Sequence, residues 1–186
     1  MPPCIHPYEF LHNSDGFLRS TPGQPAQDLN FAFGRLRLYA PGTGSVDKIE
    51  ATSQAVTGIW THYAVTRDGT GALKIYVNGA LDATARSALM APFNIGLLGQ
   101  TSAGVSNARF DDIRIWSVAR SGSQIASGMT GYVDPASAGL ERLYRFDDSS
   151  TEVRDYTRHS APAALATGVT TVTSDAWDSG SALTDG

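Results

Sequence analysis

The sequence has one cysteine, only two lysines, and no apolar stretch near the ~18 residues that a membrane-spanning helix needs. The single cysteine, Cys4, excludes an internal disulfide bond and a zinc site built on a cysteine cluster. The first ten residues, MPPCIHPYEF, lack the basic and apolar segments of a secretory signal peptide. We therefore expect no membrane insertion. The chain either stays in the cytosol, leaves the cell by another route, or belongs to a longer protein.

Charge is also scarce. Charged residues make up 17% of the chain, too few for a long solvated helix, and the net charge of −4 comes without any basic run. Nucleic acid is therefore not expected as a partner. The 41% of hydrophobic residues can fill a substantial core in one domain of 186 residues, and nineteen glycines suit a fold with many turns.

A period-two pattern dominates the middle of the chain, in WTHYAVTRDGTGALKIYVNG at residues 60–79. Alternation of apolar and polar residues is typical of strands with one buried face. Asp68-Gly69 and Asn78-Gly79 interrupt it, and both pairs favour tight turns. The segment therefore predicts two strands and the start of a third, arranged as a meander.

Similar alternation occurs elsewhere, and one short helix is expected. We predict two strands that meet at Gly34-Arg35 within residues 29–40, a weak strand over 49–56, and further strands over 108–120 and 140–146. Ser121 or Ser123 can cap a helix that ends near Gly131. Many short strands and almost no helix indicate an all-β sandwich or barrel.

The chain divides into three predicted regions. Residues 1–28 are expected to be an irregular N-terminal segment, residues 29–173 a β-sandwich, and residues 174–186 a polar C-terminal tail. A further strand is predicted at residues 169–172 inside the sandwich region.

Four motifs in order resemble laminin G-like, concanavalin A-like domains. The resemblance covers roughly residues 29–160 and implies a two-sheet antiparallel jelly-roll sandwich. Only irregular residues precede position 29, so the first strands of such a domain are either short and unorthodox here or supplied by the C-terminal segment. The motifs are WTHYAVT with IYVNG, FDDIRIW, ARS with Gln124-Ile125, and LYRFDD with Asp155.

Asp111 is the candidate metal ligand. We expect it to share the core face of a strand with Ile113 and Ile115, where a carboxylate is costly unless it is paired or bound to metal. The resembling domains often hold a structural calcium at this point, and oxygen ligands suit that ion. The alternative is that Asp111 accepts backbone N–H bonds or pairs with an arginine.

Catalytic residues are not expected. A glycosidase on this fold needs two carboxylates that face each other across the sugar. None of the four glutamates lies in such a motif, and the adjacent Asp111 and Asp112 should point to opposite faces of a strand. The sequence therefore predicts binding without turnover, and a glycoside hydrolase is the less favoured alternative.

Loops 41–48 and 100–108 are the expected ligand-binding end of the sandwich, because loops on a rigid scaffold carry recognition. A sugar site combines an aromatic face with a few convergent polar groups. Tyr39, Asp47, Asn107 and Arg109 could supply these groups. Read singly, each is also an ordinary solvated residue.

The leading functional hypothesis is a lectin-like recognition module that binds glycan or a protein surface. Family resemblance places such modules extracellularly or on a particle surface, in adhesive and multivalent assemblies. The alternative hypothesis is a purely structural spacer or decoration subunit of a multiprotein assembly. The two differ in whether the loops bind glycan or only neighbouring subunits.

Overall fold

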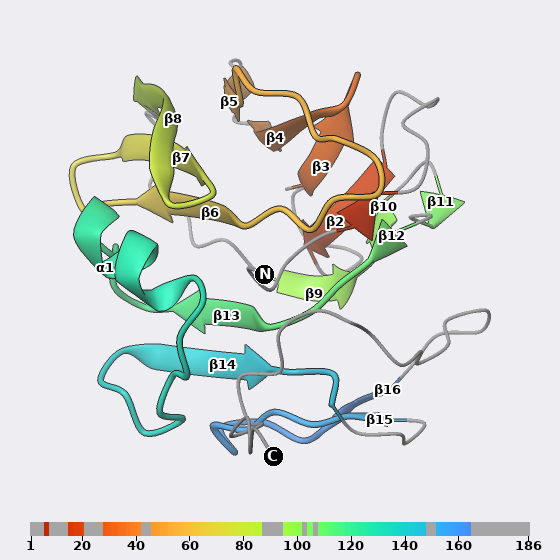
Figure 1. The fold of residues 1–186 in the computed structure, drawn as a ribbon, viewed down its shortest axis with the longest axis vertical. Coiled ribbons are helices and arrows are strands. Elements are labelled where there is room, and N and C mark those ends of the chain that lie inside the picture. The colour runs from red at the N-terminus through yellow and green to blue at the C-terminus, as the bar shows by residue number, and fades with distance from the viewer. Residues whose placement is uncertain are drawn as a thin grey trace, which may run out of the picture.

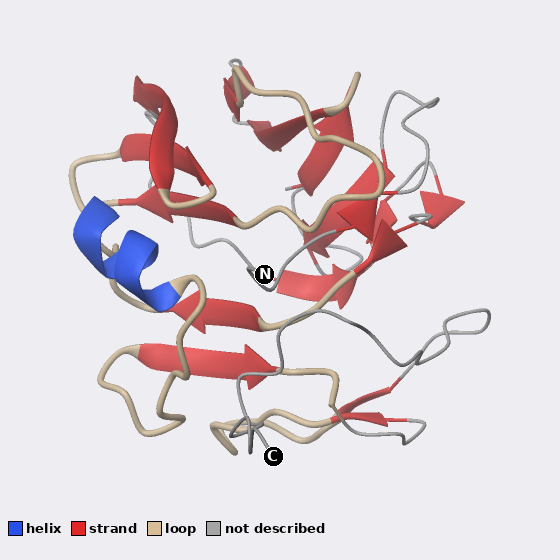
Figure 2. Ribbon diagram, viewed as in Figure 1, coloured by secondary structure: helices blue, strands red, loops and turns tan. Residues whose placement is uncertain are grey.

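The computed structural model describes residues 6–7, 15–20, 28–41, 46–86, 95–101, 104–105, 108–147 and 152–164. Strands dominate these ranges, and the single helix within them is short (Figure 2). The predicted all-β architecture is confirmed, because the strands form antiparallel sheets and the two larger sheets pack against a common core. No helix in the described part of the chain is long and apolar enough to cross a lipid bilayer.

The larger sheet has five antiparallel strands in the order β5-β4-β3-β2-β9 (Figure 1). The predicted pair of strands before residue 41 forms its centre, joined by a tight turn at Phe33 and Gly34 with φ of 51° and 76°. Such left-handed backbone suits a two-residue hairpin loop. The strands are β2 (Asp15–Ser20), β3 (Asp28–Ala32), β4 (Arg35–Pro41), β5 (Val46–Glu50) and β9 (Ile95–Leu98).

The predicted meander is the second sheet, with β6 (Tyr63–Arg67), β7 (Ala72–Val77) and β8 (Ala80–Arg86) in sequence order. The Asp68 carboxylate accepts the backbone N–H groups of Thr70 and Ala72 at 2.8 and 3.0 Å, which closes the first turn. Asn78 and Gly79 have φ of 49° and 79°, the conformation that makes Asn-Gly a strong hairpin turn.

The remaining strands pair two by two, and the only helix in the described residues follows β13 along the chain. Ser121 caps α1 (Gly122–Gly128) in a capping box with Gln124, so the predicted helix is confirmed. Strand β13 (Ile113–Trp116) pairs antiparallel with β14 (Leu140–Tyr144). The other pairs are β1 (His6–Pro7) with β12 (Ala108–Arg109), β10 (Gln100–Thr101) with β11 (Gly104–Val105), and β15 (Glu152–Val153) with β16 (Ala163–Ala164).

The main core lies between the two larger sheets. Leu29, Phe31 and Leu36 from the five-stranded sheet pack with Leu73 and Ile75 from the meander. All five are at least 90% buried, and full burial of such a side chain stabilises the fold by about 1.5–3 kcal/mol. The Phe31 and Tyr63 rings meet edge to face at 5.4 Å across the two sheets.

The structure corrects four predictions of element bounds. The weak strand expected over 49–56 is β5, which ends at Glu50, and residues 51–56 are not in a strand. Residues 1–28, expected to be irregular, contain β1 and β2, and β2 lies inside the five-stranded sheet between β3 and β9. The N-terminal segment therefore supplies one strand of the larger sheet itself, and whether the C-terminal segment supplies another stays open. The expected loops 41–48 and 100–108 contain strand residues at both ends, including most of β5. The expected strand over 108–120 is broken between β12 and β13.

Two predictions fall outside the described residues. These are the strand at 169–172 and the polar tail at 174–186. The domain boundaries stay a prediction.

Candidate functional site

The face of β3, β4 and β5 that points away from the main core carries polar side chains, and we call it the polar sheet face. Its β3 part is covered, because Asn30 is only 4% exposed, whereas its β4 part is half-buried. Side chains alternate along a strand, so Leu36 and Leu38 of β4 turn toward the core while their neighbours turn away. Cross-strand register places Asn30 opposite Arg37 and Arg37 opposite Glu50. The polar sheet face consists of Asn30, Arg35, Arg37, Tyr39 and Glu50.

Arg37 is the centre of this face. Its Nε donates to Oδ1 of the buried Asn30 at 3.2 Å, which fixes the guanidinium. The same guanidinium lies 5.8 Å from the centre of the Tyr39 ring. The Arg37 terminal nitrogens and the Tyr39 hydroxyl have no hydrogen-bond partner among the described residues, and both side chains are half-buried.

Arg35 and Glu50 flank Arg37 as a loose ion pair. Arg35 Nη1 and Glu50 Oε1 are 3.9 Å apart, and each side chain is a third or more exposed. Such a pair contributes little to stability, because water screens it. It does leave a carboxylate and a guanidinium beside the Arg37–Tyr39 unit. The face therefore combines an aromatic ring, hydrogen-bond donors and an acceptor on rigid strands.

The predicted ligand-binding residues lie on different elements where the structure describes them. Tyr39 lies on β4 of the five-stranded sheet, whereas Arg109 lies on β12, which pairs with β1. Asp47 lies within β5 with its backbone opposite Ala40, and its side chain is outside what is described. Asn107 also lies outside the described residues. Ligand contact by Asp47, Asn107 and Arg109 stays a prediction.

Sequence reasoning named Tyr39 but missed its neighbours. The alternation RLRLYA already assigns Arg35, Arg37 and Tyr39 to one face and the leucines to the other. The polar positions of that pattern could therefore have identified Arg35 and Arg37 as neighbours of Tyr39 on one face. The partner Asn30 needed the register between β3 and β4, which sequence alone does not give.

The position of Asp111 differs from the prediction. Strand β13 begins at Ile113, so Asp111 precedes the strand instead of sharing a face with Ile113 and Ile115 inside it. Its Oδ1 accepts the backbone N–H of Asp112 at 2.8 Å, and the residue is half-buried. This contact matches the alternative in which Asp111 accepts backbone N–H bonds.

The neighbouring Asp112 holds a carboxylate that is almost closed to solvent. Only 4% of its side chain is exposed, and it forms an ion pair with Arg114, whose Nε donates to Oδ1 at 2.9 Å. Arg114 also donates to the backbone carbonyls of Gly128, the last residue of α1, and of Gly131, which follows the helix. The pair therefore joins β13 to the C-terminal end of α1.

No group of three His, Cys, Asp or Glu side chains comes together as a metal-binding cluster within the described ranges. Backbone carbonyls and water can complete a calcium shell around a single carboxylate. Calcium at Asp111 stays a prediction.

A family model described as the concanavalin A-like lectin/glucanases superfamily, Laminin_G_3, matches residues 12–126. This match spans more than half of the chain. The chain belongs to the concanavalin A-like lectin/glucanase superfamily. The matched residues include β2 to β8, so the polar sheet face lies inside the superfamily domain.

One solved structure agrees with this fold. A crystal structure described as a "putative carbohydrate binding protein" from Bacteroides ovatus ATCC 8483 superposes with a TM-score of 0.64 at 23% identity. The alignment covers 87% of this superfamily member but 54% of that protein, so the chain spans about half of its length. At this identity the likeness concerns the fold.

A second similar structure is an S-layer domain-containing protein from Clostridium thermocellum ATCC 27405. Its TM-score is 0.32 at 20% identity, with 64% of this chain and 66% of that chain covered. No curated protein matches the chain significantly.

Proposed function

We propose that the chain is a non-catalytic carbohydrate-binding module and that its ligand contacts the polar sheet face through Arg37 and Tyr39. One observation carries this proposal. Arg37 is held by Asn30 at 3.2 Å beside an aromatic ring, yet its terminal nitrogens have no partner among the described residues. An aromatic surface with a fixed donor set is what sugar recognition requires. The superfamily, and a structural neighbour named for carbohydrate binding, support the same ligand class.

Binding without turnover is supported by how the acidic residues are used. Asp112 is neutralised by Arg114, and Glu50 lies beside Arg35. A glycosidase needs one carboxyl group free as acid and a second as base or nucleophile. The superfamily also includes glucanases, so catalysis is the alternative that an assay must exclude.

The setting of the module is part of the proposal. A shallow polar face binds a single sugar weakly, with Kd around millimolar. A high overall affinity then requires that many copies of the module are presented together on one assembly. We therefore propose an extracellular or particle-borne assembly that presents the module multivalently. A spacer or decoration subunit that binds only its neighbours is the alternative.

A glycan array with multivalently presented protein tests this proposal. Tyr39→Ala and Arg37→Ala should each weaken the glycan signal roughly tenfold, the effect of losing one good contact. Arg86→Ala is the matched control, because Arg86 is an exposed β8 arginine without a side-chain bond to any described residue. Asp47→Ala and Asn107→Ala test the two predicted loop residues in the same format.

Three results would contradict parts of the proposal. Glycan binding that survives both Tyr39→Ala and Arg37→Ala would place the site elsewhere. An array without signal, together with a copurifying protein whose binding survives every substitution, would favour the structural subunit. Release of reducing sugar from a polysaccharide would make the chain an enzyme.

A further inference from the structure

Three large hydrophobic side chains are exposed on two adjoining segments of the fold, and we call them the apolar tip. They are Phe33, Val56 and Ile59, which are 70%, 54% and 55% exposed. Phe33 lies in the turn between β3 and β4, and the other two lie between β5 and β6. Single exposed hydrophobic residues are normal on a protein surface, whereas a group of them on adjoining segments indicates an interaction site.

Hydrogen bonds join the two segments that carry the apolar tip. The Ala55 N–H donates to the Gly34 carbonyl at 2.7 Å, and the Gln54 side chain donates to the Phe33 carbonyl at 3.4 Å. A further bond closes the turn over residues 56–59, from the last N–H to the first carbonyl at 3.3 Å. The three side chains therefore keep fixed positions relative to one another.

Both ends of the segment over residues 51–61 are anchored to the sandwich. At its start, the Asp82 carboxylate of β8 accepts the Thr52 N–H at 2.5 Å and the Ser53 N–H at 3.2 Å. At its end, Trp60 is buried. A surface that is already ordered loses little conformational entropy on binding, so the apolar tip is preorganised for a partner.

Phe33 is placed against the preference of its backbone. Its φ of 51° is left-handed, a region in which glycine and asparagine are favoured and a bulky residue is an outlier. Asparagine would form the same turn with less strain, yet the chain has a phenylalanine here and leaves most of its ring in solvent. Burial within the described fold does not account for this residue, whereas contact with another molecule would.

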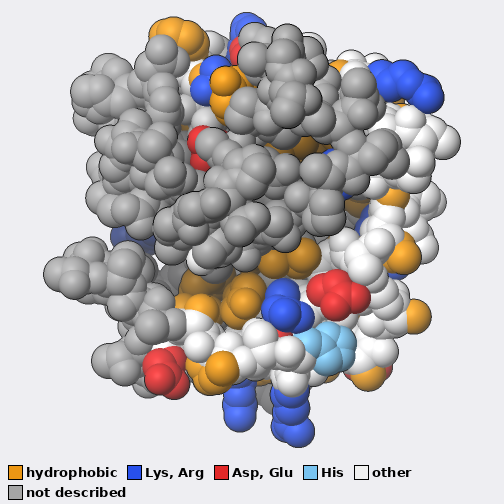
Figure 3. Space-filling model, turned by 180° about the vertical axis from the view of Figure 1, so that it is seen from behind, with side chains coloured by type: hydrophobic (Ala, Val, Ile, Leu, Met, Phe, Trp, Pro, Cys, Tyr) orange, Lys and Arg blue, Asp and Glu red, His pale blue; other side chains and the backbone are white. Residues whose placement is uncertain are grey.

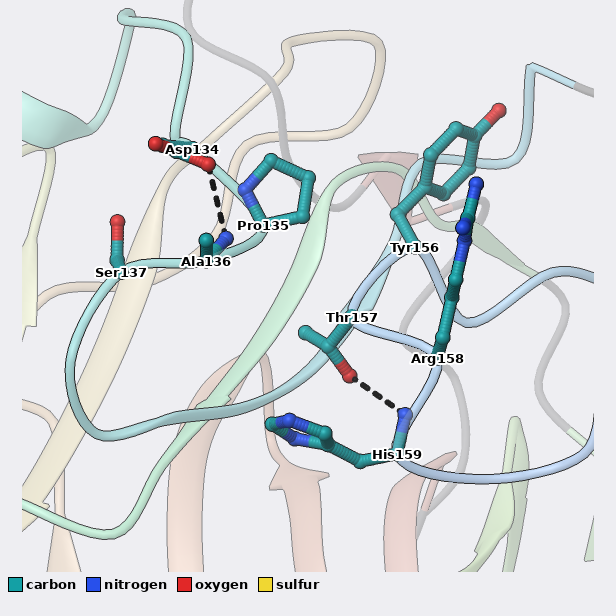
Figure 4. A pocket seen from close by; sticks show the side chains of 8 residues that line it. All are labelled: Asp134, Pro135, Ala136, Ser137, Tyr156, Thr157, Arg158 and His159. Carbon is teal, nitrogen blue, oxygen red and sulfur yellow. Dashed lines mark hydrogen bonds between the residues drawn. The ribbon is translucent and has the colours of Figure 1, made fainter.

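The apolar tip is also free of charge. Residues 51–61 contain no charged side chain. The rest of the described surface is different: seen from behind, the lower half of the molecule shows acidic, basic and histidine side chains beside hydrophobic ones (Figure 3). A pocket of about 400 Å³ there is lined by Asp134, Arg158 and His159 among others (Figure 4). The apolar tip can therefore lose its water without the cost of dehydrating a charge.

One charge of each sign borders the apolar tip. Arg35 follows the turn that holds Phe33, and Glu50 precedes the uncharged segment. Their side chains are 3.9 Å apart at the closest nitrogen and oxygen, and each is a third or more exposed. Because such a pair contributes little to stability, it can exchange partners at little cost.

We propose that the apolar tip is a self-association surface, on which a second copy of this chain docks about a two-fold axis. In a two-fold contact the same patch faces itself, so Arg35 of one copy pairs with Glu50 of the other and the reverse pair forms as well. An uncharged apolar centre bordered by one arginine and one glutamate is complementary to itself. A partner surface of a single charge sign gains nothing from this arrangement.

The size of the patch sets the strength of this contact. A stable interface buries about 800 Å² on each partner, which three side chains and their border do not reach. The dimer should therefore be weak and reversible, with Kd of about 0.1–1 mM. Arg37 and Tyr39 are not part of the apolar tip, so self-association and ligand binding can fail separately.

Sedimentation velocity of the full chain from about 10 µM to 1 mM tests the proposal, since this range brackets the expected Kd. The mean mass of the parent should rise toward that of a dimer. Phe33→Asn and Ile59→Ser should each weaken association at least tenfold. Phe33→Asn suits the left-handed backbone, so the turn survives the loss of the ring. Leu81→Thr is the matched control: it removes a hydrophobic side chain of similar exposure on β8 and should leave association unchanged.

A charge-reversal pair tests the two-fold geometry. Arg35→Glu gives a copy with two acidic residues at the border, and Glu50→Arg gives one with two basic residues. Each variant alone should associate at least tenfold more weakly than the parent, because like charges meet across the axis. A mixture of the two should regain association, because every border contact then joins opposite charges. Thermal melts of all variants confirm that the fold is kept.

The remaining outcomes overturn the proposal. A parent chain that stays monomeric at 1 mM has no self-association surface. Cosedimentation of that monomer with phosphatidylcholine vesicles, lost in Phe33→Asn, would assign the apolar tip to a lipid surface. A dimer that persists in both Phe33→Asn and Ile59→Ser has its interface elsewhere. A mixture of the charge variants that associates no better than each variant alone contradicts the two-fold contact.

Discussion

Arg114 and Asp112 form an ion pair that is almost closed to solvent, with 13% and 4% of their side chains exposed. Asp112 sits immediately before β13 with φ of 48°, so its carboxylate turns back toward the arginine two residues later. The pair and the two carbonyl contacts of Arg114 hold α1 against the sheet. This relationship assigns the important carboxylate to Asp112, where the sequence favoured Asp111.

Asp112→Asn should destabilise the fold far more than Asp111→Asn. Removing one partner of a buried ion pair leaves an uncompensated charge, at a cost of about 3–5 kcal/mol. Asparagine tolerates the left-handed backbone, so the loss reports on charge and not on φ. Urea unfolding of both variants measures the difference. If both variants lost the same free energy of unfolding, the ion pair between Asp112 and Arg114 would not be a main source of stability.

Calcium binding at Asp111 can be tested by comparing the parent protein with Asp111→Asn in the presence of a chelator. If Asp111 binds the ion, a chelator should lower the melting temperature of the parent protein and have no effect on Asp111→Asn. If no ion is bound, the chelator changes neither protein, and thermal melts with and without it separate the two cases.

His62 should make the protein lose stability between about pH 6.5 and pH 4. Burial, with a contribution from Arg114, lowers the pKa of His62 to about 4. The unfolded chain then binds a proton that the folded chain refuses, so the free energy of unfolding falls as pH drops through this window. The loss amounts to roughly 3 kcal/mol at most.

Comparison of the parent with His62→Gln isolates this effect. The variant should show a flatter dependence of unfolding free energy on pH from 7 to 4, measured by denaturant unfolding at each pH. His159 is exposed, so His159→Gln is the control and should keep the parent slope. A His62→Gln curve as steep as the parent curve would assign the acid sensitivity to other groups.

Asp155 should govern stability at lower pH. Burial raises the pKa of its carboxyl, but hydrogen bonds from Thr157, Leu143 and Ser160 outweigh it, and the pKa lies below its ordinary value. Its stabilisation is therefore complete above about pH 4 and is lost as pH falls through the lowered value. At pH 7, Asp155→Asn should cost about 1.5–3 kcal/mol, the range for a hydrogen bond to a charged group.

The gap between parent and Asp155→Asn should narrow as the pH falls below about 4, where the parent carboxyl takes up its proton. Denaturant midpoints at pH 7, 4 and 2.5 measure this narrowing. A gap that stays constant to pH 2.5 would mean that shape, and not charge, explains the effect of the substitution.

Local patterns in the sequence predicted the elements that depend on neighbouring residues. The Asn78-Gly79 turn, the capping box at Ser121 and the alternation in β3 and β4 each act within a few positions, and all three are confirmed. Strand β2 was missed because its place depends on pairing with β3 and β9, and β9 lies some 75 residues later in the chain.

The candidate sites were harder to predict than the strands, because each one joins residues that are far apart in the sequence. Tyr39 was predicted, but Asn30 joins it only through the register of two strands. A pocket of about 400 Å³ joins residues 134–137 with residues 156–159, two turns that β14 and β15 separate along the chain. Asp111 was misplaced because alternation was extended across a backbone break at Asp112, whose positive φ no pattern of polarity reveals.

The β13–β14 pair should be an indispensable part of the same fold, and Leu143 tests this. Leu143 is fully buried, its N–H donates to Asp155 at 3.2 Å, and its carbonyl accepts the Tyr156 N–H at 2.9 Å. Leu143→Ala should cost about 2–5 kcal/mol, the price of a cavity in a packed core. Leu81→Ala, at a site 55% exposed, should change stability by less than about 0.5 kcal/mol.

A chain ending at Gly139 extends the same test from one side chain to the whole strand. It lacks β14 and Asp155, so Ile113 loses its backbone partner Tyr144 and the buried contacts of Leu140 and Leu143 disappear. Leu140, Leu143 and Phe146 are too few to form a core of their own, so they must pack as part of the sandwich. Because their removal takes part of that core away, the shortened chain should lose its cooperative thermal transition. Near-ultraviolet circular dichroism and calorimetry of both chains decide the matter. If the shortened chain melts as cooperatively and at the same temperature as the full one, β14 is an appendage to the sandwich and the prediction is wrong.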